Sequence, residues 1–158
     1  MKVKDIMQKD IISLAPSTPL NNAATIFYEK NFYALPVVEN KKLIGIITER
    51  DFIVPGENVY LPSYIKFLSE LPCSKEIELD IRKEYKKLAD IPVFDIMNTN
   101  VVTAEPDTEL RELIKILSEK KLHSIPVVDK ANNIQGMVSI RDIIKLFQSS
   151  QRAIEALN

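Results

Sequence analysis

The chain has 158 residues, of which 46% are hydrophobic, and 21 basic side chains stand against 22 acidic ones. This length allows one ordinary domain or two small halves that share a core. The near-neutral charge favours neither nucleic acid nor an anionic membrane as a partner. Without a signal-peptide pattern or a run of about 18 apolar residues, the sequence predicts a cytoplasmic protein.

Residue types that most catalytic and metal sites require are scarce. Cys73 and His123 are the single cysteine and histidine, so we expect no internal disulfide and no metal site. A packing or loop thiol is favoured for Cys73 over a catalytic nucleophile. The three glycines are isolated, which excludes a P-loop or a GxGxxG loop. We therefore predict no catalytic residues and no enzyme activity.

The start of the chain predicts a β-α-β-β-α unit. VKDIM (3–7) and the β-branched run at 11–13 are expected strands, and Thr18 stands where an N-cap hydroxyl would serve. A helix is indicated by apolar residues at i, i+3, i+4 and i+7, which are Leu20, Ala23, Ala24 and Phe27. LPVV (35–38) and LIGIIT (43–48) then predict a hairpin, and a second helix closes the unit.

A helical insertion is expected at 56–91, which has no counterpart elsewhere in the chain. Helical patterns occur at 61–68 and at 74–90, and Glu78 lies four residues before Arg82. We interpret the charged face of the second helix as a solvated surface with salt bridges rather than as a binding patch.

The chain then repeats its first unit. At an offset of ninety residues VKDIM aligns with VFDIM (93–97), and LPVV aligns with IPVV (125–128). After one inserted turn residue, GIITERD (45–51) matches GMVSIRD (136–142). The helix between these motifs has the same apolar spacing, at Leu110, Leu113, Ile114 and Leu117, and Thr108 stands where an N-cap hydroxyl would serve. Such duplication predicts two similar units, each with a small sheet that the other must help to cover, so neither half should fold well alone.

A last helix is indicated by Ile140, Ile143, Ile144 and Phe147. Its apolar pattern continues through Ile154 and Leu157, so we predict a C-terminal helical extension at 149–158. An apolar stripe longer than one unit needs favours a homodimer through this helix. The alternative is a frayed tail, because QSSQ (148–151) is polar.

These motifs resemble paired cystathionine-β-synthase-type (CBS) domains. The resemblance rests on DIM, a P-x-T helix start, an apolar-Pro-Val strand and Gly-apolar-x-[Ser/Thr]-x-x-Asp, in this order in both copies. It covers a first repeat at 1–55 and a second at 92–148. It implies an α/β (α+β) fold in which two β-α-β-β-α repeats pack with pseudo-two-fold symmetry, with the insertion between them. Such modules are regulatory and often form dimers.

The resemblance also implies that the protein binds adenosine-containing ligands, namely AMP, ADP, ATP or S-adenosylmethionine, as regulatory ligands rather than as required cofactors. Asp51 and Asp142 would accept hydrogen bonds from ribose hydroxyls, since one carboxylate can accept both vicinal hydroxyls. Hydroxyls near the phosphate or nucleoside would come from Thr48, Ser139, Thr18 and Thr108. The adenine would meet backbone around Ala34, Leu35, Pro36, Ser124, Ile125 and Pro126, with Ile12 and Val102 as apolar walls.

Four other side chains allow two interpretations each. Arg50 and Arg141 could reach phosphates or could be solvated on a first helical turn. His123 could contact phosphate, although a surface or packed imidazole is favoured. Tyr33 could stack on a base, although packing is favoured.

The repeated aspartates also have a purely structural interpretation. Thr48 to Asp51 and Ser139 to Asp142 have the spacing of a capping box, in which the carboxylate accepts a bond from the N-cap amide. Two functions remain open. One is a non-catalytic sensor that acts on a separate effector protein, and the other is a structural dimerisation module with empty sites.

Overall fold

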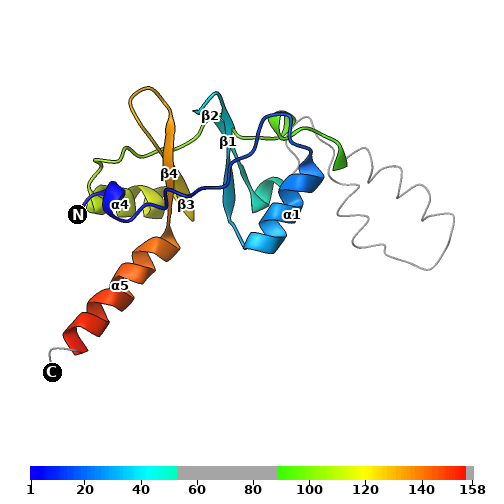
Figure 1. Ribbon diagram of the computed structural model, residues 1–158. Coiled ribbons are helices and arrows are strands. Elements are labelled where there is room, and N and C mark those ends of the chain that lie inside the picture. Colours follow the sequence, from blue (N-terminus) through cyan, green and yellow to red (C-terminus); the bar gives the residue numbers. More distant parts are fainter. Residues whose placement is uncertain (53–88, 156–158) are drawn as a thin grey trace, which may run out of the picture. The chain divides into compact units, whose positions relative to one another are not determined.

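The computed structural model describes residues 1–52 and 89–155 (Figure 1). The predicted insertion lies almost wholly outside these ranges, and with it Cys73 and the charged helix face. Within them the chain divides into two compact units, which we name after the repeat that supplies most of each. The described residues of the first-repeat unit are 13–39, 44–52 and 89–101. Those of the second-repeat unit are 1–12, 40–43 and 102–155.

Both repeats contain the predicted helix and hairpin, followed by a helical turn or helix. In the first repeat these elements are α1 (Leu20–Lys30), β1 (Ala34–Glu39), β2 (Lys42–Thr48) and the 3₁₀ helix η2 (Glu49–Phe52). In the second they are α4 (Leu110–Lys120), β3 (Ser124–Val128), β4 (Ile134–Ser139) and α5 (Ile140–Glu155). Each hairpin is a two-stranded sheet. The mixed α/β fold of two repeats is therefore confirmed.

The strands expected before each helix are not formed. VKDIM and VFDIM instead contain the 3₁₀ helices η1 (Val3–Asp5) and η3 (Val93–Asp95). Their backbone groups bond locally, because the N–H groups of Ile6 and Met7 both donate to the Val3 carbonyl. The β-branched runs that follow lead only to isolated parallel bridges, Leu14 with Val37 and Ala104 with Val127. The segments before each helix therefore form local hydrogen bonds and single bridges instead of the ladder of a strand.

The predicted N-cap role of Thr18 and Thr108 is also wrong. The N-cap positions are Pro19 and Glu109, and neither side chain caps its helix. The first helical N–H group is accepted instead by a backbone carbonyl from the opening segment of the other repeat. These pairs are Leu20 with Ile91 at 2.8 Å and Leu110 with Met1 at 3.0 Å. A helix start whose donors already have backbone acceptors does not need a side-chain cap.

Each repeat's opening segment thus lies in the unit built by the other repeat. In the second-repeat unit, the Val3 N–H donates to the Thr108 carbonyl at 2.9 Å. Gln8 and Met137 exchange two backbone hydrogen bonds of 2.8 and 2.9 Å. The corresponding pairs in the first-repeat unit are Val93 with Thr18, and Asn98 with Ile46. The exchange also reaches the cores, because Val3 and Val93 are fully buried among residues of the other repeat.

Gly45 and Gly136 mark the places where these exchanged segments pass closest. A Cβ atom at Gly136 would lie 2.6 Å from the backbone carbonyl oxygen of Gln8. At Gly45 it would collide with the side chain of Met97. The glycine of the repeated motif thus lies where the opening segment approaches closely, against backbone at Gly136 and against a flexible side chain at Gly45. Neither glycine has a positive φ angle.

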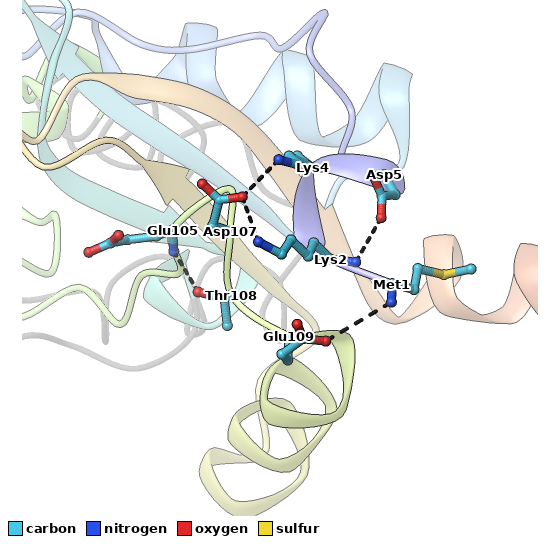
Figure 2. A network of polar contacts seen from close by, with 8 residues as sticks. All are labelled: Met1, Lys2, Lys4, Asp5, Glu105, Asp107, Thr108 and Glu109. Carbon is cyan, nitrogen blue, oxygen red and sulfur yellow. Dashed lines mark hydrogen bonds and ion pairs between the residues drawn. The ribbon is translucent and has the colours of Figure 1, made fainter.

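Charged side chains hold the opening segment of the second-repeat unit (Figure 2). The ammonium groups of Lys2 and Lys4 lie 3.0 and 2.8 Å from Oδ1 of Asp107, and the terminal amine lies 4.0 Å from Glu109. Hydrogen bonds from Lys4 and Lys2 lower the pKa of Asp107 from 3.8 to about 2. All of these groups lie at the surface.

Candidate ligand-binding site

In the second repeat the Gly-to-Asp stretch ends β4 and begins α5. Oδ2 of Asp142 accepts the backbone N–H of Ser139 at 2.9 Å and its hydroxyl at 2.6 Å. The Asp142 N–H donates back to Oγ of Ser139 at 3.3 Å. The predicted capping box is therefore formed. Both lone pairs of Oδ2 are occupied, because this oxygen already accepts two hydrogen bonds within the capping box.

The other Asp142 oxygen also has partners. Oδ1 accepts a hydrogen bond of 2.9 Å from the Gln8 side-chain amide, and the Lys145 ammonium lies 3.7 Å away. Asp142 is only 7% exposed and is the single buried charged residue among those described. Hydrogen bonds to both oxygens offset the cost of burying this polar group. Asp142 thus has little acceptor capacity left for a ligand.

The equivalent carboxylate in the first repeat has different surroundings. Oδ2 of Asp51 accepts the Thr48 backbone N–H at 2.6 Å and the Thr48 hydroxyl at 2.9 Å. Asp51 is half-buried rather than buried. Among the residues that the structure describes, none donates a hydrogen bond to its second oxygen. Asp51 therefore has a fixed orientation and, within the described ranges, one oxygen without a donor.

Gln8 is a site residue that the sequence comparison did not identify. It aligns with Asn98 of the second copy, at the same offset as the DIM motifs. The Asn98 side chain is one methylene shorter, and its Oδ1 accepts the N–H of Asn100 at 2.9 Å. In the sequence, the only sign of a special role for Gln8 was that the aligned residue in the second copy is an asparagine. Only the folded chain shows that this position faces the aspartate of the other repeat.

The six predicted adenine-lining residues lie at the starts of β1 and β3. Leu35, Pro36, Ile125 and Pro126 are fully buried core residues. The carbonyls of Pro36 and Pro126 accept the N–H groups of Leu14 and Ala104, at 2.9 and 3.0 Å. The side chains of these four residues are therefore buried in the core, and the predicted contact of adenine with their backbone stays a prediction. Ala34 and Ser124 are half-buried.

Ser124 adds a polar feature to the second-repeat unit. It is paired in register with Ser139 across the antiparallel β3–β4 ladder. Its hydroxyl oxygen is buried and has no hydrogen-bond partner among the described residues. Ala34 occupies the corresponding place in the first repeat. The two candidate sites therefore differ in polarity as well as in the state of their carboxylates.

Thr18 and Thr108 lie at the junctions with the exchanged segments. Both are half-buried, and their carbonyls accept the N–H groups of Val93 and Val3. The Thr108 hydroxyl accepts the N–H of Glu105 at 3.1 Å, beside the charged network of Figure 2. Each hydroxyl could still donate one bond to a ligand.

The remaining predicted residues lie mostly at the surface. Arg50, Arg141 and His123 are exposed, and the Ile140 N–H donates to the His123 carbonyl at 2.9 Å. Tyr33 is 44% exposed and Ile12 is 39% exposed. Val102, in contrast, packs against the core of the second-repeat unit.

No group of three His, Cys, Asp or Glu side chains is placed to hold a metal ion in the parts of the chain that the structure describes. Among the described helices, none is long and apolar enough to cross a membrane.

The fold and these paired carboxylates define a class of tandem α/β repeat proteins whose repeats exchange their opening segments. The profile of the CBS domain matches residues 3–54 and 93–149, and the chain belongs to this family. It is a CBS domain pair, which is a regulatory module.

Solved CBS structures share the architecture of the chain. The CBS domain pair of protein MJ0100, solved in complex with 5-methylthioadenosine and S-adenosyl-L-methionine, is 26% identical. The alignment covers 95% of this chain and 98% of that one, with a TM-score of 0.65. Protein MJ1225 from Methanocaldococcus jannaschii is also 26% identical, with a TM-score of 0.71 over 92% of this chain and 47% of that one.

An enzyme is found among the curated relatives. The chain is 27% identical over 141 residues to an inosine-5'-monophosphate dehydrogenase of Thermoplasma acidophilum. The match covers 88% of this chain but 22% of the dehydrogenase. The likeness is therefore to a minor part of that enzyme and does not carry its activity to this chain.

Proposed function

We propose that this CBS pair is a non-catalytic sensor for an adenosine-containing ligand, either AMP, ADP, ATP or S-adenosylmethionine. The observation that carries the proposal is the carboxylate of Asp51, which the capping box orients and whose second oxygen accepts no hydrogen bond from the part of the chain that the structure describes. One oxygen has two lone pairs and can accept both hydroxyls of a ribose. A related CBS pair, that of MJ0100, is solved with two ligands that contain adenosine.

A sensor of this kind needs no chemical step. A ligand that prefers one arrangement of the two units shifts their equilibrium, and about 1.4 kcal/mol of preference shifts it tenfold. We propose that the change is passed to a separate effector protein, which recognises the favoured arrangement. The competing function is a dimerisation module whose sites stay empty.

Thermal unfolding with a nucleotide panel tests the proposal. A ligand that binds only the native state stabilises it by about 2.7 kcal/mol at one hundred times its Kd, so the melting temperature should rise with AMP, ADP, ATP or S-adenosylmethionine. The matched control is 2',3'-dideoxyadenosine monophosphate, which lacks the ribose diol and should give a smaller shift. Unchanged melting with all four ligands would favour the dimerisation module.

We also propose that the protein is a homodimer held partly by α5. Ile140, Ile144 and Phe147 are 39%, 52% and 73% exposed, and their spacing places them on one face of this helix. Such a continuous apolar face is normally covered by a partner. Sedimentation equilibrium should give twice the chain mass, and Phe147→Asp should weaken the association. A wild-type mass of one chain at micromolar concentration would exclude the dimer.

A further inference from the structure

We infer that Gln8 keeps the Asp142 site from binding the ribose, so that the chain has one operative site, at Asp51. This inference rests on the proposed function and specifies which of the two carboxylates performs it. The two aspartates are equivalent by alignment and have the same capping box, but their remaining acceptor oxygens differ.

The two aspartates differ in how many of their carboxylate lone pairs are already used. A carboxylate offers about four lone-pair positions, and in both aspartates Oδ2 is used by two donors from the capping residue. A ribose diol must therefore donate to Oδ1. In Asp142 this oxygen accepts the Gln8 amide at 2.9 Å and faces the Lys145 ammonium at 3.7 Å. In Asp51 none of the described residues donates to it.

Burial also favours Asp51 over Asp142 as the carboxylate that binds the ligand. Asp142 is 7% exposed, so a ligand could reach it only by displacing the groups that cover it. Displacing Gln8 would break a charge-assisted hydrogen bond and leave Oδ1 of the buried Asp142 carboxylate without that donor. Asp51 is half-buried, and an incoming hydroxyl displaces no donor that belongs to residues 1–52 or 89–155.

Gln8 is held in place by its backbone. Its N–H and C=O groups both bond to Met137, and its carbonyl oxygen lies against Gly136. The side-chain amide is thereby directed to Asp142 at little cost in backbone entropy. The equivalent Asn98 has the same backbone pairing with Ile46, but its side-chain oxygen is used by the N–H of Asn100. Among the contacts of the two carboxylates, the hydrogen bond from Gln8 to Asp142 thus has no counterpart from Asn98 in the described residues.

Calorimetric titration of the full chain with AMP and with S-adenosylmethionine tests the inference. Wild-type protein should bind one ligand per chain, and Asp51→Asn should weaken this site about tenfold or more, the effect of one lost charge-assisted hydrogen bond. Gln8→Ala should expose a second site, for a total of two ligands per chain. The double variant Gln8→Ala with Asp142→Asn should lose that second site.

Two further variants serve as controls. Gln8→Asn retains an amide but shortens it to the length of Asn98, so it should also expose the second site if Gln8→Ala does not fold. Asn98→Ala changes the matching position of the first-repeat unit and should leave one ligand per chain.

The outcomes separate the two proposals. Two ligands per wild-type chain, or one ligand per chain in both Gln8 variants, would overturn the role of Gln8 while the sensor function stands. Binding that survives Asp51→Asn and disappears with Asp142→Asn would reverse the assignment of the sites. No binding by any variant would reject the sensor function, and this inference with it.

Discussion

The two opening segments make the same backbone contacts with different side chains. The Lys4 N–H donates to the Pro106 carbonyl at 2.9 Å, and the Phe94 N–H donates to the Pro16 carbonyl at 3.1 Å. Around these bonds, the side chains of the charged second-repeat junction differ from those of its counterpart. The differing aligned pairs include Lys2 and Pro92, Lys4 and Phe94, and Asp107 and Ser17. Main-chain geometry therefore defines the exchange of segments, and the side chains at the junctions have been free to diverge.

The largest loss of unfolding free energy is expected at Gly136, where the opening segment leaves no space for a side chain. Gly136→Ala places a methyl group against the Gln8 backbone, which cannot rotate away without breaking its pairing with Met137. Overpacking of this kind costs about 1 to 3 kcal/mol of unfolding free energy. We expect that loss in urea denaturation, together with faster hydrogen exchange in β4.

Gly45→Ala is the matched variant in the first-repeat unit. Its methyl group meets the Met97 side chain, which is unbranched and can change rotamer. We expect a clearly smaller loss of unfolding free energy than for Gly136→Ala. Equal losses in the two variants would show that the backbone of the opening segment is not the rigid part of the junction.

A smaller effect on stability is expected from the ion pairs that Asp107 forms with Lys2 and Lys4. The pKa of Asp107 is lowered from 3.8 to about 2, so its ion pairs contribute fully above the usual pKa and are lost as the pH falls through about 2. Asp107→Asn should therefore flatten the pH dependence of the urea midpoint between these values, and added salt should reduce the difference from wild type.

Ser17→Ala is the control for this comparison, because Ser17 has no lysine at the aligned positions. The variant should retain the wild-type pH dependence. If Asp107→Asn does the same, the lysine contacts do not contribute to the stability of the fold.

Much of the fold could be predicted because it follows from local patterns. Apolar spacing identified α1 and α4, and alternating branched residues identified both hairpins. The strand prediction for VKDIM was wrong because the pattern of apolar residues does not reveal which carbonyl a backbone N–H will choose. The Val3 carbonyl accepts two of these bonds within the segment itself.

The candidate site was predictable only in part. The spacing of Thr48 to Asp51 and of Ser139 to Asp142 correctly predicted the capping boxes, which are contacts within four residues. The partner of Asp142 is Gln8, which lies 134 residues away in sequence and reaches it only through the exchange of opening segments. Sequence spacing carries no information about such a contact, so the two sites looked equivalent.

The most direct test of this account is hydrogen–deuterium exchange of the full chain with and without saturating AMP or S-adenosylmethionine. Binding at Asp51 should slow exchange of the amides in Gly45–Phe52, because the ligand restricts local opening there. The matching amides of Gly136–Asp142 should be slowed much less. Equal protection of both stretches, or protection confined to the second, would contradict the claim that two repeats of the same fold carry one operative site.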